Sequence, residues 1–225
     1  MIARQLLAAL VAAAWLSAAN AQDVIDHSLQ VESDTSSVLW QKERTREAAG
    51  DFKGAIDVCR QILHDHPKQQ AQALTAIAGL YGKQHRYRDE IAWANRALAV
   101  APDFFAAEVN IGNAQAQLGQ LKEAQASFER ARTMAPREPM PVYSLGVLAE
   151  NRHDVPAAIA LYEQSVGLAP GFDSGWFNLA AMYASARRWD DALAALDKVL
   201  ALDPHAEDAR AMRRHVESDK AAAAR

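Results

Sequence analysis

Five prolines recur along the chain at an almost constant interval, and this period constrains the fold more than any other feature. The prolines Pro67, Pro102, Pro136, Pro170 and Pro204 lie 35, 34, 34 and 34 residues apart. Each follows a stretch that is rich in alanine and leucine and has helical periodicity. A fixed period in this range indicates stacked structural repeats. Aligned on the prolines, the chain divides into five units: 36–69, 71–104, 105–138, 139–172 and 173–206, with Gln70 as an extra residue.

Equivalent positions of the five units carry side chains of similar size. Small residues dominate the eighth position (Glu43, Ala78, Gly112, Gly146, Ala180) and the twentieth (Ala55, Glu90, Ala124, Ala158, Ala192). Larger ones recur at the seventeenth (Phe52, Tyr87, Leu121, Val155, Trp189) and the twenty-fourth (Cys59, Ala94, Phe128, Tyr162, Leu196). Two packed helices need small side chains where their backbones come closest and larger ones beside that point. The pattern predicts a pair of helices in each unit, with the second helix starting at the seventeenth position.

This spacing, with its terminal proline, resembles the tetratricopeptide repeat across residues 36–206. The resemblance implies an all-α fold, a right-handed superhelix (α-solenoid) of five helix-turn-helix repeats. The abundance of alanine, the best helix former, agrees with an all-α fold. We expect the charged segment 205–219 to form a C-terminal capping helix that covers the end of the array, followed by a tail at 220–225.

Some positions break the pattern or mark helix ends. In the second unit Glu90 stands where alanine is expected and Ala94 where a large residue is expected, so we expect a shifted or loosely packed second helix. Glu43 and Arg46 weaken the first helix of the first unit, so we expect this end to fray or to be completed by a partner. Aspartates precede several helical stretches and are predicted N-caps: Asp51, Asp103, Asp154 and Asp203, the last followed by Pro204 at the first helical position.

The N-terminal segment reads as a signal peptide spanning residues 1–21. Arg4 precedes the apolar stretch 6–19, and Ala19-Asn20-Ala21 has the pattern of a signal-peptidase site, which predicts cleavage before Gln22. The alternative is an uncleaved membrane anchor, but the stretch is shorter than the roughly 20 apolar residues that a spanning helix needs. We expect a periplasmic or secreted protein without stable membrane insertion, beginning with a mobile acidic leader at 22–35.

The sequence contains no signature of catalysis or cofactor binding. HExxH, CxxC, GxSxG, GxGxxG and P-loop patterns are absent, so we predict a non-enzymatic protein without metal or cofactor. Cys59, the single cysteine, is expected to be a small buried hydrophobe. The formal net charge of -4 provides no basic field for nucleic acid.

The resemblance places ligand-facing residues on the first helix of each unit, along the concave groove of the superhelix. Carried onto this chain, the groove positions give Arg44, Thr75, Val109, Asn110, Asn113, Met140, Tyr143, Val147, Glu150, Phe177 and Asn178. Aromatic side chains can anchor a peptide, and asparagine amides can bond both N–H and C=O of its backbone. The alternative for Val109, Met140 and Phe177 is packing between adjacent first helices. The cationic clamp for chaperone C-termini is incomplete, because its positions read Trp40, Arg44, Ala106 and Asn110.

The leading hypothesis is a cell-envelope adaptor or scaffold that binds a peptide or protein segment in this groove. The alternative is a structural scaffold that self-associates end to end through its terminal repeats, as a homo-oligomer. An enzymatic function would require a site built from dispersed residues that no motif reveals. The sequence does not identify the partner, because proteins with the same fold have many functions.

Overall fold

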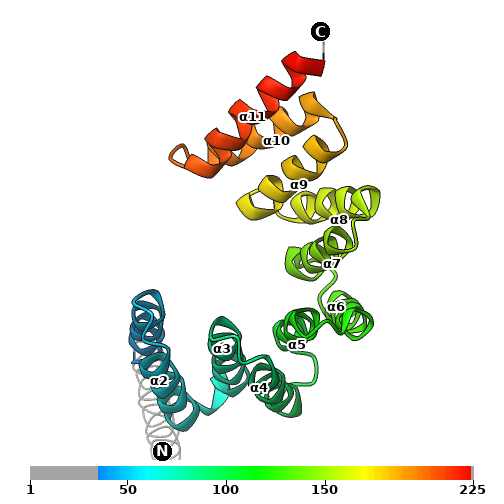
Figure 1. Cartoon of the computed structure of the whole chain (residues 1–225). Coiled ribbons are helices and arrows are strands. Elements are labelled where there is room, and N and C mark those ends of the chain that lie inside the picture. Colours follow the sequence, from blue (N-terminus) through cyan, green and yellow to red (C-terminus); the bar gives the residue numbers. More distant parts are fainter. Residues whose placement is uncertain (1–34, 224–225) are drawn as a thin grey trace, which may run out of the picture. The chain divides into compact units, whose positions relative to one another are not determined.

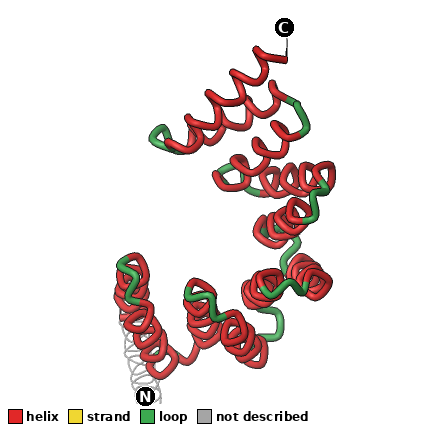
Figure 2. The backbone as a smooth tube through the Cα atoms, viewed as in Figure 1, coloured by secondary structure: helices red, strands yellow, loops and turns green. Residues whose placement is uncertain are grey.

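A computed structural model describes residues 35–223, which are helices joined by short loops and turns (Figures 1 and 2). No strand occurs in this stretch. The expected signal peptide and residues 22–34 of the expected leader lie outside the described residues, whereas Thr35 is helical. The chain forms two compact units, Met1–Ala76 and Ile77–Arg225, and their boundary falls inside helix α3.

The described part of the first unit contains helical residues 35–48, α2 (Phe52–Asp65), the short 3₁₀ helix η1 (Pro67–Gln69) and the beginning of α3 (Gln70–Lys83). Residues 35–48 continue as helix through Glu43 and Arg46, where we expected fraying. Val58, Ile62 and Ala73 form a buried cluster, against which Leu39, Trp40 and Leu63 pack. The indole N–H of Trp40 donates to Oε1 of Gln69 at 2.6 Å, which joins the first helix to η1.

Cys59 lies in the interior of the first unit, as expected for a small hydrophobe. Its side chain is fully buried and forms no disulfide. Burial, reinforced by the charges of Glu43 and Glu47, raises the pKa of the thiol to about 12. Since the thiolate is the reactive form, this cysteine has the character of a packing residue.

The second unit continues from α3 into eight further helices. These are α4 (Tyr87–Val100), α5 (Phe105–Gln117), α6 (Leu121–Met134), α7 (Pro139–Asn151), α8 (Val155–Leu168), α9 (Asp173–Ser185), α10 (Trp189–Leu202) and α11 (Glu207–Ala223). From α4 onward each helix packs against the next one along the chain (Figure 1). The predicted all-α fold class is therefore observed throughout the described residues.

The size pattern of the sequence is explained by helix packing. Helices α2, α4, α6, α8 and α10 begin at the predicted residues Phe52, Tyr87, Leu121, Val155 and Trp189. The small residues at the eighth and twentieth positions and the residues at the twenty-fourth position are all buried. A β-carbon built on Gly112 would lie 2.4 Å from Cε1 of Phe128, and one built on Gly146 would lie 2.7 Å from the ring of Tyr162. Glycine at these positions therefore lets the aromatic ring of the second helix rest on the backbone of the first.

The turn inside each repeat has the same backbone geometry. Its fifteenth residue adopts a left-handed conformation in all five units: Gly50, His85, Gly119, His153 and Arg187, with φ between 57° and 75°. In the fifth repeat the N–H of Arg188 bonds to the carbonyl of Tyr183, and the N–H of Arg187 to that of Ala184. This is the Schellman arrangement, which satisfies carbonyl groups at the end of a helix. A shared turn explains the regular spacing of the second helices.

Two of the four predicted N-caps are correct. The carboxylates of Asp51 and Asp154 accept from backbone N–H groups in the first turns of α2 and α8, at 2.9 Å and 3.1 Å. The predictions for Asp103 and Asp203 are wrong, because Phe104 is the N-cap of α5 and Asp203 is the C-cap of α10. Helix α11 accordingly begins at Glu207, after Pro204, and extends to Ala223, so residues 220–223 of the expected tail are helical.

Helix α4 in the second repeat is not shifted in register relative to its counterparts. It begins at Tyr87 like its counterparts, and both Glu90 and Ala94 are buried in it. Gly82 of α3 lies directly against the Glu90 carboxyl group, so glycine provides the space that a larger side chain needs. At this contact between the two helices of the second repeat, Gly82 and Glu90 thus replace a pair of small side chains.

Candidate functional site

Two clefts in the second unit contain residues predicted to face the groove. The first, here called the C-terminal cleft, has a volume of about 460 Å³. Helix α7 contributes Tyr143 and helix α9 contributes Asp173, Ser174, Phe177 and Asn178. The remaining wall comes from Val199 and Asp203 of the α10 end and from residues 206–209 at the start of α11.

A hydrogen-bond network fixes the aromatic wall of the C-terminal cleft. The side-chain amide of Asn178 donates to the hydroxyl of Tyr143 at 2.9 Å and lies 3.4 Å from that of Tyr162. Tyr162 in turn donates to Oε2 of Glu150 at 2.7 Å. The Tyr143 ring also packs edge-on against Phe172, with 4.9 Å between ring centroids. Tyr143 is thus held in place before any ligand arrives.

The Tyr143 hydroxyl has donor capacity toward the cleft. Burial, together with the nearby charge of Glu150, raises its pKa, although the hydrogen bond from Asn178 opposes the shift. The hydroxyl therefore remains protonated at neutral pH. Because it accepts from Asn178, its own proton is available for a ligand acceptor.

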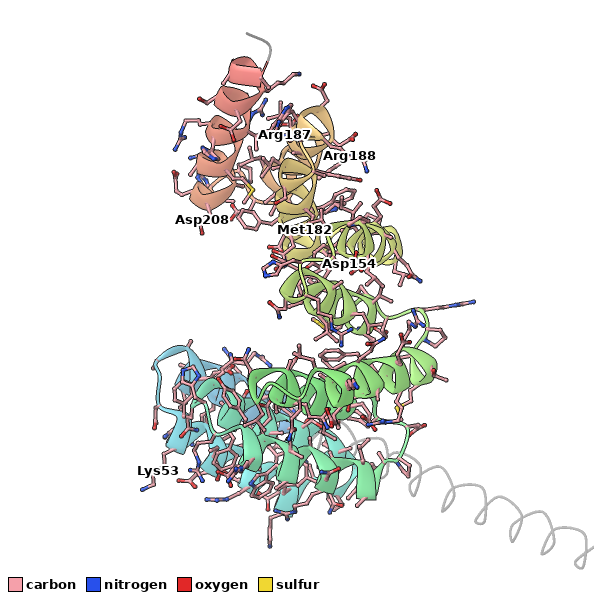
Figure 3. All side chains as sticks on the ribbon, turned by 45° about the vertical axis from the view of Figure 1, so that its right-hand side comes forward. Lys53, Asp154, Met182, Arg187, Arg188 and Asp208 are labelled. Carbon is pink, nitrogen blue, oxygen red and sulfur yellow. The ribbon has the colours of Figure 1, made fainter. Side chains whose placement is uncertain are left out.

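Four carboxylates line the same cleft: Asp173, Asp203, Glu207 and Asp208. Among residues 35–223, no lysine or arginine lines it. Asp173 accepts from the backbone N–H of Ser174, Asp203 from that of His205, and Glu207 pairs with Arg210 at 2.6 Å. Asp208 lies in the first turn of α11 (Figure 3). Like charges around one cleft produce a negative potential, which favours a positively charged or N–H-rich ligand.

The second cleft, here called the Asn cleft, has a volume of about 420 Å³. It is bounded by α3 through Gly79, Gly82 and Lys83, by the turn residue His85, by α4 through Tyr87 and Glu90, and by α5 through Asn110, Asn113 and Gln117. Its wall on α5 is a row of side-chain amides. Glu90 of α4 also lines this cleft, and only 5% of the residue is exposed.

Within the second unit, predicted groove residues line two different clefts. The structure brings Tyr143, Phe177 and Asn178 together in the C-terminal cleft, and Asn110 and Asn113 in the Asn cleft. Arg44 is exposed and Thr75 half-buried within the first unit, and Met140 is exposed on α7 outside both clefts. Val147 packs against the core formed around Tyr162.

Val109 and Glu150, two of the predicted groove residues, have side chains that contact neighbouring helices. Val109 is 5% exposed and belongs to the core cluster with Phe128 and Leu145, which is the packing alternative stated for it above. Glu150 accepts the hydrogen bond of Tyr162, so its carboxylate supports the aromatic wall. Both lie on first helices as the resemblance implies, but contacts with neighbouring helices occupy their side chains.

The sequence analysis missed the acidic residues of both clefts. Asp173, Asp203, Glu207 and Asp208 lie at helix ends, where a carboxylate ordinarily needs no functional explanation. Only the chain fold brings the ends of α9, α10 and α11 to one cleft. Glu90 did carry a signal, because it interrupted a position otherwise occupied by alanine.

Comparisons with known proteins identify the repeats. The sequence profile of the tetratricopeptide repeat family matches residues 109–172, and a second profile of that family matches residues 174–206. The predicted start of each second helix and the buried small positions agree with these matches. The chain is a tetratricopeptide repeat protein.

Solved structures show the same fold at low sequence identity. A thermophilic tetratricopeptide repeat protein of Thermus thermophilus is 20% identical with a TM-score of 0.69, covering 80% of this chain and 97% of that one. MamA of Desulfovibrio magneticus RS-1 is 18% identical with a TM-score of 0.53, covering 76% and 96%. YrrB, described as having an unusual peptide-binding site, is 17% identical with a TM-score of 0.52, covering 76% and 88%.

A curated relative shares part of its sequence with this chain. Cellulose synthase operon protein C of Pseudomonas fluorescens (strain SBW25) is 30% identical over 181 residues, which is 76% of this chain and 14% of that protein. The chain therefore spans a small part of its relative's length. Tetratricopeptide repeat proteins generally serve as non-catalytic scaffolds for protein–protein interaction.

Two further observations concern residues 35–223. No helix in this stretch is both long and apolar enough to cross a membrane. Within the same stretch, no three side chains of His, Cys, Asp or Glu are grouped so that they could hold a metal ion.

Proposed function

We propose that this chain is an adaptor of the cell envelope that binds a peptide or protein segment in the clefts formed by its first helices. The main observation that supports this proposal is the preorganised C-terminal cleft. Tyr143 is held by Asn178 and Phe172 and lies beside Phe177, so an incoming segment meets rigid aromatic surface at a low cost in side-chain entropy. The peptide-binding site named in the description of YrrB supports the same use of the fold.

The polar groups of the C-terminal cleft suit a polypeptide ligand. The Tyr143 hydroxyl can donate to a backbone carbonyl, and the surrounding carboxylates can accept from backbone N–H groups or basic side chains. An open cleft of about 460 Å³ accommodates a few residues of an extended or helical segment. Affinity would then come from the aromatic anchors and specificity from the polar rim.

Two serines of α9 provide a matched test of this cleft. Ser174 is exposed and lines the cleft, whereas Ser185 is exposed at the far end of the same helix and does not. We expect Ser174→Trp to abolish binding of peptides selected by the full chain from a random 12-residue displayed library. Ser185→Trp should leave their affinity unchanged within about two-fold, because both changes add the same apolar surface.

The same pair of variants can contradict the proposal. Circular dichroism should first show that both variants keep the helical content of the parent. If folded Ser174→Trp binds the selected peptides as tightly as Ser185→Trp does, then the C-terminal cleft is not the peptide site. If the library yields no binder, peptide binding itself is contradicted.

Export to the envelope is a separate part of the proposal. It rests on the apolar N-terminal stretch and the small residues Ala19 and Ala21 before Gln22. When the full chain is produced in a Gram-negative host, mass spectrometry of the N-terminal peptide of the protein from the periplasmic fraction should identify Gln22 as the first residue. Recovery of the chain only from the cytoplasm, starting at Met1, would contradict export.

A further inference from the structure

The side chain of Glu90 is buried in the second unit without a hydrogen bond or ion pair from any residue in 35–223. Only 5% of the residue is exposed. Burial alone raises the pKa of its carboxyl group to about 7, and no neighbouring charge offsets this effect. Burial of a carboxylate without a partner costs several kcal/mol. A residue that only fills space at this position would not need to be acidic.

Glu108 shows how this fold accommodates a buried glutamate that has only a structural role. It is also 5% exposed, but Nε and an Nη of Arg130 donate to its two carboxylate oxygens at 2.9 Å each. The bidentate ion pair with Arg130 thus neutralises the carboxylate of Glu108. Glu90 lies one helix earlier in the chain and has no equivalent of Arg130.

The surroundings of Glu90 preserve room for its carboxyl group. A β-carbon built on Gly82 would lie 2.5 Å from Oε2 and 2.8 Å from Oε1 of Glu90. In the third and fifth repeats the equivalents of Gly82 and Glu90 are both alanine: Ala116 with Ala124, and Ala184 with Ala192. The second repeat therefore differs at both positions at once, and the glycine leaves the space that the carboxyl group occupies.

Glu90 lines the Asn cleft together with the amide-bearing residues of α5. Asn113 and Gln117 are exposed on α5, and their side-chain oxygens can accept hydrogen bonds. The cleft therefore places one buried carboxyl group and several amide groups around a space of about 420 Å³. These acceptors suit a compact cation that donates several hydrogen bonds. A metal ion would require more carboxylate or histidine ligands than the described residues bring together here.

We propose that the Asn cleft is a specificity pocket for a lysine or arginine side chain of the bound segment, whose cationic group pairs with Glu90. This inference rests on the proposed function, since it assigns the chemistry of one residue in the ligand. The amide groups of Asn113 and Gln117 then bond the remaining N–H groups of the cation or the adjoining backbone. The incoming charge takes the role that Arg130 has beside Glu108.

Pairing of this kind depends on pH, because Glu90 must lose its proton to bind the cation. Lys83, His85 and Tyr87 are the other titratable residues that line the cleft, and His85 shares a hydrogen bond with Tyr87 at 2.8 Å. A positive charge on His85 would also repel a cation. The His85→Asn variant separates the two effects, because asparagine tolerates the left-handed conformation at this position (φ 58°).

The test uses small probes and the full chain labelled with ¹⁵N. Nα-acetyl-lysine N-methylamide and its arginine analogue should shift the side-chain amide signals of Asn113 and Gln117 in a saturable manner at pH 8. The norleucine analogue, which lacks the charge, should not. Glu90→Gln should weaken lysine binding at least about ten-fold, as should a change from pH 8 to pH 5.5 in both the parent and His85→Asn.

A matched variant controls for net charge. Glu123→Gln removes one negative charge from an exposed site in the first turn of α6 and should leave the probe affinities unchanged. Equal shifts with the norleucine probe, unchanged lysine affinity in Glu90→Gln, or no shift with any probe would each overturn the inference. The inference would also be overturned if the parent formed a concentration-dependent dimer that Glu90→Gln abolished. In that case a second copy of the chain would provide the cation.

The two proposals fail in different experiments. If the probes behave as expected but folded Ser174→Trp and Ser185→Trp bind library peptides alike, the cation pocket stands and the peptide site in the C-terminal cleft is wrong. If Ser174→Trp abolishes peptide binding but Glu90→Gln does not alter binding of the lysine probe, the adaptor function stands and the cation pocket is wrong.

Discussion

Replacement of Phe128 by alanine should lower the free energy of unfolding by about 3–5 kcal/mol. The side chain is 2% exposed and lies in the cluster formed by Val109, Ala124, Ala131, Leu145 and Leu148. Its removal loses the transfer free energy of a large ring and leaves a cavity that rigid helices cannot fully close. Urea denaturation followed by circular dichroism would measure the change.

Gly112 packs against the Phe128 ring, so variants at this position test the same prediction. Gly112→Ala alone should cost about 1–3 kcal/mol, because the new β-carbon would lie 2.4 Å from the Phe128 ring. The double variant should lose less stability than the sum of the single variants, since the new methyl group then occupies part of the vacated space. The second repeat already has this combination, with buried Ala78 and Ala94 at the equivalent positions.

A glycine elsewhere in the second unit provides the control. Apart from its two chain neighbours and the backbone of its own helix, no heavy atom of the described residues lies within 4 Å of a β-carbon built on Gly167 in α8. Gly167→Ala should therefore be neutral or stabilise by up to about 1 kcal/mol. Strict additivity of the Phe128→Ala and Gly112→Ala effects would show that the two residues do not share a packing site.

The second large effect concerns stability as a function of pH. Burial raises the pKa of Glu90 from 4.5 to about 7, so the folded state favours the neutral carboxyl group. Its contribution is fully present below pH 4.5, falls as the pH rises toward 7, and is lost above that value. We therefore compare the free energy of unfolding of the parent with that of Glu90→Gln at each pH. The value for the parent minus the value for the variant should be about 2 kcal/mol lower at pH 8 than at pH 5.

Urea denaturation of both proteins at pH 5, 6, 7 and 8 would measure this difference. Contributions from the histidines are common to both proteins and cancel. Glu123→Gln is again the charge control, and its stability difference from the parent should not follow the same curve. A parent that gains stability relative to Glu90→Gln as the pH rises would show that the Glu90 carboxylate has a cationic partner in the free protein.

Several elements of the fold could be predicted from the sequence because the same pattern of residue sizes recurs in five repeats. Each second helix begins at the predicted residue, from Phe52 to Trp189, and the predicted small positions are buried. Period and residue size carry this information directly, since close helix packing permits only small side chains at the contact points. The N-caps were predicted less accurately than the helix starts. Asp203 precedes a proline, as an N-cap often does, yet it is the C-cap of α10.

The candidate site was predictable only to the level of the helices that bear it. The resemblance placed Tyr143, Phe177 and Asn178 on first helices, and the structure assembles them in one cleft. Their partners come from far along the chain, as with the bond from Asn178 to Tyr143, 35 residues away. Such contacts depend on how one repeat packs on the next, which a pattern within a repeat does not contain.

The sequence by itself determined the helical repeat, the register of the helices and the positions of the small core residues, because these follow from periodicity and side-chain volume. Tertiary structure alone decided which polar residues have partners. It buried Val109, bonded Glu150 to Tyr162 and paired Glu108 with Arg130, but provided no such partner for Glu90 among the described residues. The physical reason is that the cost of burying a charge depends on its three-dimensional neighbours, whereas helix formation and packing size are encoded locally.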